Sequence, residues 1–342
     1  MSKASVAVVM VGCGQFSRRY HLPTLEGDRG VELAAIFDPR PAAAVAALAQ
    51  RTGAALVDRL EALPNPSGKV MAIVTTPHTL HATHVRFALE RNWHVLCDKP
   101  FVMHLAEAVE LAALARVRGL IGAVAFNRRY DRGCLAARNI IHSGQIGRVR
   151  YVETVQLGYE RAGWFLEPAL GGGGPYTGRA SHMADLLPWL LAERPTEVRA
   201  RLRGDGKTRT DRGGFIELRF GEIECRLTCI EEGWHMWDEV RIFGEQGLIE
   251  LRRPLSVPIG WELWHWGERY RLLSRLDAEP VEGAATREFL EAVRTAGPVA
   301  CSFAEAAVSV AIIEAAFASA RQDEGWRALC NGGQPRGAAR EP

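Results

Sequence analysis

The chain lacks a block of basic residues, a long hydrophobic run and any paired spacing among its seven cysteines. Its formal net charge is +2 and its Lys and Arg residues are scattered, so we do not expect it to bind nucleic acid or an anionic membrane surface. The apolar run at residues 4–11 is cut by Gly12, which makes it too short to span a membrane, and it lacks a signal-peptide cleavage pattern. Cysteines without paired spacing indicate reduced thiols, which predicts a cytoplasmic protein.

The 342 residues are enough for two domains, and the first third of the chain alternates strand and helix signals. Helices are predicted between Pro41 and Gly53, at 79–90 and at 104–118. Continuous apolar runs predict strands at 6–11, 31–37, 69–74, 93–97 and 120–126. Fully apolar strands that alternate with helices indicate a parallel sheet covered on both faces. Residues 1–126 are therefore predicted to form an α/β domain with a doubly wound parallel sheet.

After residue 126 the pattern changes to period-two strands. A helix is predicted at 132–142, and two more at 285–295 and 302–321. Strands are predicted at 149–158, 197–202, 215–220, 224–230, 239–243 and 248–251. This indicates an α+β domain over 127–330 with a large, mainly antiparallel sheet. Residues 331–342 are expected to be a disordered tail.

A glycine-rich turn follows the first strand. In G-C-G-Q-F-S, Gly12 allows a tight turn and Gly14 lets backbone amides reach a pyrophosphate at the start of the next helix, while Ser17 replaces the usual third small residue. Asp38 ends the second strand, where its carboxylate can accept hydrogen bonds from a ribose 2′-hydroxyl and repel a 2′-phosphate. This favours NAD over NADP, although the nearby Arg40 leaves NADP open. The alternative is a surface turn with a capping Asp.

Further polar residues follow the third and fourth apolar strands. Thr75, Thr76 and Pro77 follow one strand and Lys99 the next, and the carboxyl ends of parallel strands meet at one edge of a sheet. The sequence therefore predicts a dinucleotide site at this edge. The residues expected to contact the cofactor are Gly12, Gly14, Gln15, Phe16, Asp38, Arg40, Thr75, Thr76, Pro77, His81, Asp98 and Lys99. No metal site is predicted.

Several motifs in this order resemble the Gfo/Idh/MocA family of glucose–fructose oxidoreductase, inositol dehydrogenase and relatives. They are G-C-G-Q-F-S-R-R-Y-H-L-P, T-T-P-H-T-L-H, C-D-K-P, F-N-R-R-Y-D, S-G-Q-I-G-R-V, G-G-G-P-Y-T-G-R-A-S-H-M-A-D and R-I-F-G-E-Q-G-L-I-E-L. The resemblance extends over residues 5–325. It implies a Rossmann domain, then a sheet domain that carries the substrate and a homodimer or homotetramer interface, with NAD(P)-dependent chemistry on sugars, cyclitols or similar polyols.

The resemblance also implies two catalytic residues. Lys99 occupies the catalytic lysine position of a motif usually written E-K-P, with Asp98 in place of Glu and an expected cis bond to Pro100. A lysine beside an oxidised nicotinamide has a lowered pKa that suits proton transfer. His182 matches the family's H-x-x-D histidine, with Asp185 as its second member, and can exchange a proton with a substrate hydroxyl. The alternatives are a solvated lysine and a histidine that caps a helix.

The chain departs from the family pattern just before His182. Many family dehydrogenases have an Asp four residues earlier, where this chain has Gly178. Two residues are new candidates for the substrate site: Arg179 can hold a carboxylate or phosphate, and Tyr176 can donate a proton. Packing or surface positions are the alternative for both.

Other substrate candidates lie at the predicted domain junction and in an aromatic loop. Arg128 and Tyr130 are expected to contact substrate at the junction, and Trp164 to line a sugar-binding loop, with bridging and packing as the alternatives. Tryptophans also crowd the later strands, where they indicate core or subunit contacts. They are Trp234, Trp237, Trp261, Trp264 and Trp266.

The leading hypothesis is an NAD(P)-dependent oxidoreductase that transfers hydride between nicotinamide and a secondary alcohol or ketone of a sugar, cyclitol or sugar-acid-like substrate. Lys99 would poise the reacting oxygen and His182 would relay the proton. Two alternatives remain open: a non-catalytic NAD-binding regulator or sensor, and a redox-neutral NAD-dependent glycosidase. Gly178 favours the first of these alternatives.

Overall fold

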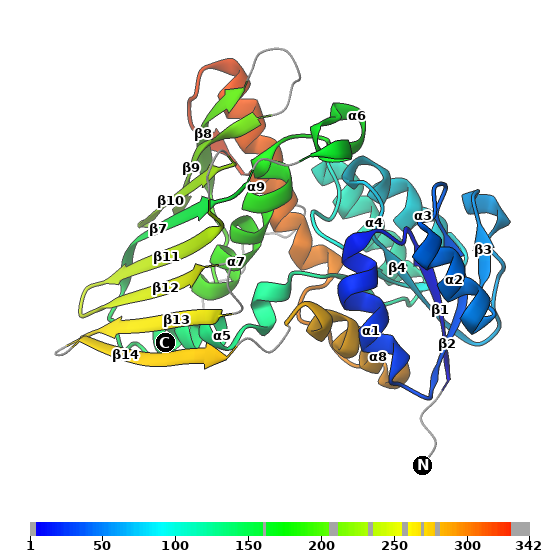
Figure 1. The fold of residues 1–342 in the computed structure, drawn as a ribbon. Helices are drawn as coiled ribbons and strands as arrows, with labels where there is room; N and C mark the ends of the chain where they lie inside the picture. The colour runs from blue at the N-terminus through cyan, green and yellow to red at the C-terminus, as the bar shows by residue number, and fades with distance from the viewer. Residues whose placement is uncertain are drawn as a thin grey trace.

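The computed structural model describes residues 5–159, 162–204, 211–231, 235–254, 259–267, 270–277 and 281–329. They form two β-sheets that lie side by side with helices packed against both (Figure 1). The predicted tail at 331–342 lies outside the described residues, as does Trp234. The two-sheet architecture confirms the predicted fold class.

The first sheet has six strands, all parallel, in the order β3-β2-β1-β4-β5-β6. Its strands are β1 (Val6–Val11), β2 (Val31–Phe37), β3 (Ala55–Val57), β4 (Lys69–Val74), β5 (His94–Cys97) and β6 (Gly122–Val124). All six residues of β1 are buried, which explains why its sequence is apolar throughout rather than alternating. The parallel sheet expected from the apolar runs is confirmed.

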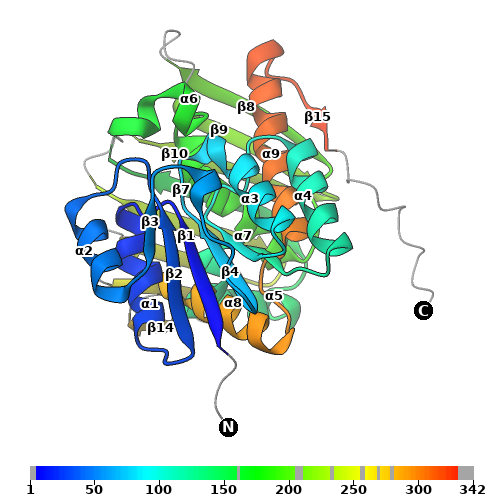
Figure 2. The same cartoon turned by 90° about the vertical axis from the view of Figure 1, so that its right-hand side faces the viewer.

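Helices cover both faces of this sheet, as the view onto the first domain shows (Figure 2). The helices of the N-terminal half are α1 (Leu22–Glu26), α2 (Ala43–Thr52), α3 (His81–Glu90) and α4 (Leu105–Val117). Helix α8 (Ala284–Thr295), far away in the sequence, completes one face. Its Phe289 and Val293 share a buried cluster with Val6 and Val8 of β1. The core of the first domain therefore draws on both ends of the chain.

The second sheet has nine strands, in the order β14-β13-β12-β11-β7-β10-β9-β8-β15. All neighbours are antiparallel except β7 and β10, as expected for a mainly antiparallel sheet. Its strands are β7 (Val149–Leu157), β8 (Glu197–Gly204), β9 (Asp211–Phe220), β10 (Ile223–Ile230), β11 (Trp237–Gly244), β12 (Leu248–Pro254), β13 (Ile259–Trp266), β14 (Tyr270–Asp277) and β15 (Arg327–Ala328). The last three were not predicted from the sequence.

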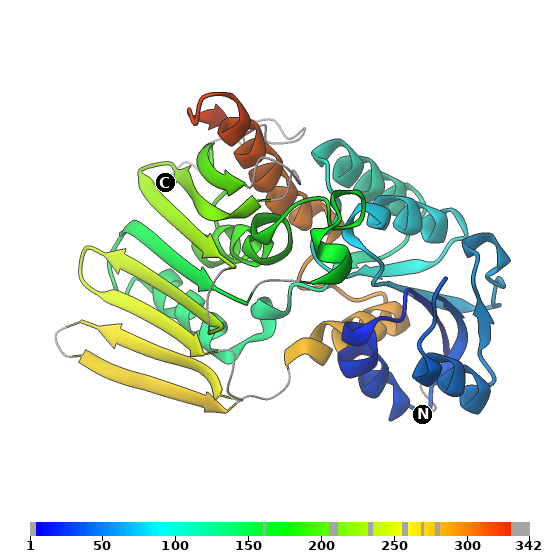
Figure 3. The same ribbon diagram turned by 45° about the horizontal axis from the view of Figure 1, so that its top comes forward.

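Three helices pack on one face of the second sheet, between it and the first domain (Figure 3). They are α5 (Arg132–His142), α7 (Ser181–Leu191) and α9 (Phe303–Gln322). Among the described residues, no helix covers the opposite face. By length and composition alone, helix α9 is long and apolar enough to cross a membrane. Half of its apolar segment is buried inside the protein, and the helix contacts α4, α7 and β8 as a core helix does.

Candidate active site

The glycine-rich turn after β1 has a backbone that only glycine adopts without strain. Gly12 has φ +88°, and a Cβ added to it would lie 2.9 Å from the amide nitrogen of Thr76. Thr75 donates its hydroxyl to the Gly12 carbonyl at 2.8 Å, and Ser17 hydrogen-bonds the Thr75 hydroxyl. The buried Ser17 thus ties the turn to the end of β4. By contrast, a Cβ on Gly14 would meet no atom within 4 Å, which leaves open space beside its backbone.

Asp38, at the end of β2, turns its carboxylate towards this glycine turn. One oxygen accepts from the amide of Cys13 at 3.2 Å, and the other accepts from the amide of Arg40 at 3.0 Å. Gln15 and the Arg40 side chain are exposed, while Phe16 is half-buried. An oriented carboxylate beside an open glycine turn fits the ribose and pyrophosphate of a dinucleotide.

His81 links the loop that follows β4 to the loop that follows β5. Its ring is buried, with Nδ1 2.8 Å from the Pro100 carbonyl oxygen and Nε2 2.8 Å from the Thr76 carbonyl oxygen. Burial lowers the pKa of His81, while these carbonyls oppose the shift. His81 therefore holds the loop at Thr76–Pro77 against the loop that follows Lys99, from inside the protein.

Lys99 reaches from the first domain to the second. Its peptide bond to Pro100 is cis, as the family resemblance implied, and its amide donates to the Asp98 carboxylate at 2.8 Å. The half-buried ammonium donates to the main-chain carbonyl of Gly178 at 3.2 Å. Gly178 belongs to a π-helical turn (η6, Tyr176–Ala180) that runs directly into α7. The Lys99 ammonium therefore lies against the turn that leads to His182.

His182 is the second residue of α7 and is half-buried. Its ring lies edge-on to that of Phe126, with the ring centres 6.3 Å apart. Phe126 follows β6 at the carboxyl edge of the first sheet. The structure thus places both predicted catalytic residues where the two domains meet.

The three charged or hydroxylic candidates Arg128, Arg179 and Tyr176 are buried and have protein partners. Arg128 pairs with Asp238 of β11, and Arg179 pairs with Glu231 at 3.1 Å. The buried Tyr176 hydroxyl donates to the Leu227 carbonyl at 3.4 Å, and burial raises its pKa well above the ordinary value. These contacts make the three residues part of the packing between η6, the domain junction and the second sheet.

The two aromatic candidates Tyr130 and Trp164 each contact the other domain or a helix packed on it. The Tyr130 hydroxyl donates to Glu288 of α8. Trp164, half-buried in the short turn η5 (Gly163–Leu166), stacks on Phe165 with ring centres 3.8 Å apart and meets His78 edge-on at 4.9 Å. An aromatic side chain of the second domain thus contacts the loop that follows β4 of the first.

Two residues of the motif T-T-P-H-T-L-H were not predicted as site residues. His78 is buried with Nδ1 3.0 Å from the Gly171 carbonyl oxygen, and Thr79 donates its hydroxyl to the Ala169 carbonyl at 2.6 Å. Both carbonyls belong to the short helix α6 (Pro168–Gly171) of the second domain. The motif had indicated only cofactor contact, yet two of its seven residues hold the helix that directly follows the turn with Trp164.

Asp211, at the start of β9, was also missed. Its carboxylate accepts from the amides of Gly174 at 3.0 Å, Tyr176 at 3.3 Å and Gly213 at 3.2 Å. Gly174 is required here, because a Cβ would lie 1.8 Å from the Asp211 carbonyl oxygen. Burial raises the pKa of Asp211 to about 7, although the three amides oppose the shift. Asp211 therefore anchors the glycine-rich segment that leads to His182.

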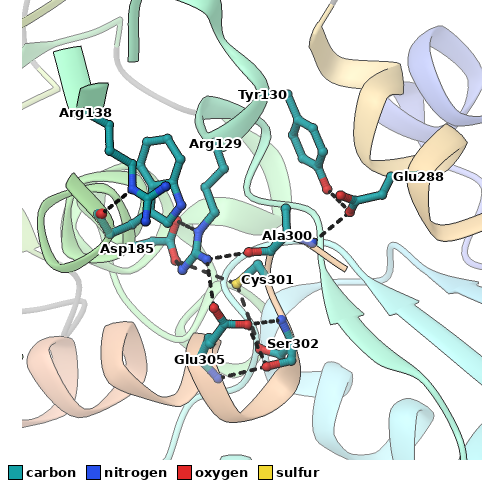
Figure 4. A network of polar contacts seen from close by, with 10 residues as sticks. Arg129, Tyr130, Arg138, Asp185, Glu288, Ala300, Cys301, Ser302 and Glu305 are labelled. Carbon is teal, nitrogen blue, oxygen red and sulfur yellow. Dashed lines mark hydrogen bonds and ion pairs between the residues drawn. The ribbon is translucent and has the colours of Figure 1, made fainter. Parts of the chain in front are cut away.

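A buried polar network holds α7 against the domain junction and the start of α9 (Figure 4). Arg129 donates to both carboxylate oxygens of Asp185, at 2.6 and 2.9 Å, and contacts Glu305 at 3.4 Å. Ser302 and Glu305 form a capping box at the start of α9. Asp185 lies one helical turn after His182, so this network ties the histidine's helix to the domain junction and to α9. Among the described residues, no cluster of three or more metal-ligating side chains occurs.

Family models match both halves of the chain. Residues 6–126 match "Oxidoreductase family, NAD-binding Rossmann fold", and residues 134–250 match "GFO/IDH/MocA C-terminal domain". The chain therefore belongs to the Gfo/Idh/MocA family of oxidoreductases, as the sequence motifs implied, and its first domain is the family's NAD-binding Rossmann domain.

Comparison with individual proteins adds relatives of known activity. The chain is 33% identical over 203 residues to "1-carboxy-3-chloro-3,4-dihydroxycyclo hexa-1,5-diene dehydrogenase" of Comamonas testosteroni, over 58% of this chain and 50% of that protein. It is 27% identical over 298 residues to "Inositol 2-dehydrogenase 2" of Saccharopolyspora erythraea, over 84% of each. The matches to the Comamonas testosteroni dehydrogenase and to three further curated oxidoreductases span only 36% to 55% of the length of those proteins.

Solved structures share the fold over the whole molecule. GenD2 from gentamicin A biosynthesis, solved in complex with NAD, has a TM-score of 0.81 and 22% identity, over 96% of this chain and 97% of that chain. At this level of identity the likeness establishes the architecture alone.

Proposed function

We propose that this protein is an NAD-dependent oxidoreductase that acts on a secondary alcohol or ketone of a sugar, cyclitol or sugar-acid-like small molecule. The contact that carries the proposal is the one between the Lys99 ammonium and the Gly178 carbonyl. It joins the edge of the nucleotide-binding sheet to the turn that leads to His182. Relatives named as cyclic-diol and inositol dehydrogenases support the reaction class.

The residues around the glycine turn would hold the dinucleotide. Gly12 allows the tight turn against Thr76 and Gly14 leaves room for the pyrophosphate, while Asp38 is oriented by two backbone amides to accept from ribose hydroxyls. The carboxylate disfavours a 2′-phosphate, so we assign NAD rather than NADP even though Arg40 is close. Bound NAD supplies a hydride acceptor at its nicotinamide ring, and NADH supplies a hydride donor.

Lys99 and His182 would divide the work on the substrate oxygen. The Lys99 ammonium is directed by the Gly178 carbonyl and can stabilise negative charge on that oxygen. His182 can take the hydroxyl proton during oxidation and return it during reduction. Gly178 cannot supply the carboxylate that many relatives have at its position, and here its main-chain carbonyl orients the lysine instead.

The predicted substrate residues receive different roles. Trp164 is the candidate for direct contact with a sugar ring, because its loop from the second domain lies against the loop after β4. Arg128, Tyr176 and Arg179 are buried in protein contacts and would shape the substrate site from behind. We further propose that the protein works in the cytoplasm, as a homodimer or homotetramer joined through the second sheet.

One observation favours a second function, an NAD-binding sensor without turnover. This chain has Gly178 at the position where the family resemblance implies an Asp four residues before the catalytic histidine. A sensor would bind the cofactor and a ligand but would not change the nicotinamide absorbance. The retained Lys99 and its contact with Gly178 favour the enzyme.

The test combines cofactor binding with turnover. We expect calorimetric titration to give a lower Kd for NAD(H) than for NADP(H). A panel of sugars, glycosides, cyclitols and uronates is then followed at the nicotinamide absorbance. The variant Lys99→Met should lower kcat by about 10²–10⁴-fold. Its matched control is Lys69→Met, because Lys69 also donates to main-chain carbonyls but lies at the opposite end of the sheet.

Each outcome of the binding and turnover experiments has a defined interpretation. Unchanged turnover in Lys99→Met would refute the assigned mechanism, and equal losses in both lysine variants would show a general defect rather than a catalytic one. Tight NAD binding without turnover across the panel would favour the sensor. Tighter binding of NADP(H) would overturn the role given to Asp38.

A further inference from the structure

A short segment of the second domain crosses to the first domain and lies on its cofactor edge. We call residues 163–172 the strap; it contains the turn η5, which carries Trp164, and the helix α6. Helix α6 contacts η3 (His78–Leu80), the short helical turn that directly follows the expected cofactor residues 75–77. In Figure 1, α6 lies at the top of the boundary between the two domains.

Two side chains of η3 fasten the strap to the first domain. The His78 Nδ1 lies 3.0 Å from the Gly171 carbonyl oxygen, and it carries the proton of this hydrogen bond because a carbonyl only accepts. The Thr79 hydroxyl donates to the Ala169 carbonyl at 2.6 Å. The Trp164 ring meets the His78 ring edge-on, with the ring centres 4.9 Å apart. The contacts that fasten the strap therefore also place Trp164.

The strap is otherwise attached weakly, because most of it faces solvent. Residues 166–169 are exposed, with Leu166 47% exposed, and Gly171 is the one buried residue of the strap. Each end of the strap is a glycine in the left-handed region, Gly163 with φ +68° and Gly172 with φ +71°. A segment with few buried contacts opens at a low cost in free energy, and small residues at its ends can absorb the change in backbone angles.

The other side of the domain boundary is held much more firmly. Arg129 forms a buried two-point ion pair with Asp185 and donates to the Ala300 carbonyl. The Tyr130 hydroxyl donates to Glu288 of α8, which lies below α6 in Figure 1. A buried ion pair is costly to separate, whereas the contacts that fasten the strap are neutral hydrogen bonds and a ring contact. The boundary between the domains is therefore expected to open on the strap side.

The strap lies on two loops that leave the cofactor edge of the first sheet. One loop follows β4 and carries Thr76 and the residues of η3, and the other follows β5 and carries Lys99 and Met103. A Cβ on Gly172 would collide with the Met103 side chain, so the strap also touches the second loop directly. Ligands of an open parallel sheet bind at the carboxyl ends of its strands, which are the ends from which these two loops leave.

We propose that the strap is a gate for the cofactor, and that His78 and Thr79 are positioning residues that keep this gate closed. The inference rests on the cofactor site of the proposed function. NAD or NADH enters and leaves while the strap is unfastened, and fastening the strap brings Trp164 to the substrate site. A gate that does not favour the bound over the free protein slows association and release equally, so it leaves the Kd nearly unchanged.

The deciding experiment measures NADH exchange on the whole chain in the absence of any substrate. Stopped-flow fluorescence gives the association rate, and displacement of bound NADH by excess NAD gives the release rate. The double variant His78→Phe with Thr79→Val keeps the ring and the branched side chain but removes both hydrogen bonds to the strap. Each neutral hydrogen bond favours the fastened state about fivefold, so we expect both rates to rise about 25-fold while the Kd changes less than about threefold.

Matched controls remove similar hydrogen bonds that lie within one domain. His142→Phe removes a contact of 3.0 Å between its Nε2 and the Leu190 carbonyl oxygen, and Thr52→Val removes a hydroxyl that donates to the Leu48 carbonyl at 2.8 Å. Both controls should exchange NADH at the wild-type rates. The conservative variant His78→Asn keeps an N–H donor near the position of Nδ1, so its rates should stay within about threefold of the wild type.

The outcomes separate a gate from other roles of the same residues. Wild-type rates in the double variant would overturn the proposal, and so would an equal acceleration in the double variant and the controls. Faster release with unchanged association would raise the Kd and show that His78 or Thr79 binds the cofactor itself. If His78→Asn exchanges NADH as fast as the double variant does, its hydrogen bond does not fasten the strap. Failure to turn over any sugar would count against the proposed function but would leave these rates interpretable.

A single substitution tests the same inference if the double variant does not fold. Thr79→Val changes one half-buried side chain to another of the same shape, and we expect association and release to rise about fivefold. Hydrogen exchange of the α6 amides reports separately on the strap, since the amides of Gly171 and Gly172 donate to carbonyls within it. Faster exchange of these amides with unchanged NADH rates would show that the strap detaches without gating the cofactor, which would overturn the proposal.

Discussion

Replacing Asp185 by Asn tests whether the buried network behind His182 stabilises the fold. Asp185 and Arg129 form a two-point ion pair at 2.6 and 2.9 Å, and their side chains are only 2% and 5% exposed. Burial by itself lowers the pKa of Arg129, but the charge and hydrogen bonds of Asp185 raise it above its ordinary value. The substitution therefore leaves a permanently charged guanidinium in a buried position.

The expected loss follows from what remains around Arg129. Removing one partner of a buried ion pair costs about 3–5 kcal/mol, because the other charge stays buried. The Ala300 carbonyl and the half-exposed Glu305, 3.4 Å away, still compensate part of the charge. We therefore expect Asp185→Asn to lower the free energy of unfolding by about 3 kcal/mol, the lower end of that range.

Urea unfolding measures this loss as a lower midpoint with an unchanged slope. The control is Glu110→Gln, which breaks the exposed pair with Arg86 and should leave the midpoint nearly unchanged. The double variant Arg129→Met with Asp185→Leu should recover most of the loss, since apolar side chains of similar volume replace buried ion pairs well. If Asp185→Asn costs no more than Glu110→Gln, the network does not stabilise the fold as argued.

Two further predictions concern the turn at Gly12 and the anchor at Asp211. Gly12→Ala should destabilise the fold by about 1–3 kcal/mol and weaken NAD binding, because its φ of +88° and a Cβ 2.9 Å from the Thr76 amide nitrogen both oppose a side chain. Gly14→Ala should leave the melting temperature unchanged, and equal melting temperatures for the two variants would contradict this. Burial raises the pKa of Asp211 from 3.8 to about 7, so its proton favours the folded state below about pH 4 and this contribution is lost as the pH rises through 7. Melting temperatures from pH 4 to 8 should fall less in Asp211→Asn than in the wild type, and parallel curves would exclude the shift.

The sequence was sufficient for five of the six strands of the first sheet and for their carboxyl edge, but it did not predict the short outer strand β3. Apolar runs such as 6–11 identified strands buried on both faces, since nothing but a covered parallel sheet accommodates six consecutive buried side chains. Gly12 and Asp38 were recognisable because each directly follows a strand. Their meeting, through the amide of Cys13, follows from the rule that parallel strands end at one edge.

Pairing across long distances in the chain was decided only by the tertiary structure. Arg128 and Arg179 were predicted to contact substrate because a local sequence shows a charge but not its partner. Asp238 and Glu231, which pair with them, lie 110 and 52 residues further along the chain. Asp211 was missed for the same reason, since its three amide donors include two more than thirty residues away.

The alternating pattern of a strand such as β7 shows which of its residues face the core, and this information is contained in the local sequence. Helix α8 likewise has an apolar stripe, but only packing determined that the stripe covers the first sheet rather than the second. The register of the strands in the second sheet is set by their buried faces together. Local periodicity therefore determined most of the elements and the cofactor edge, whereas cross-strand register and domain packing determined which charges meet.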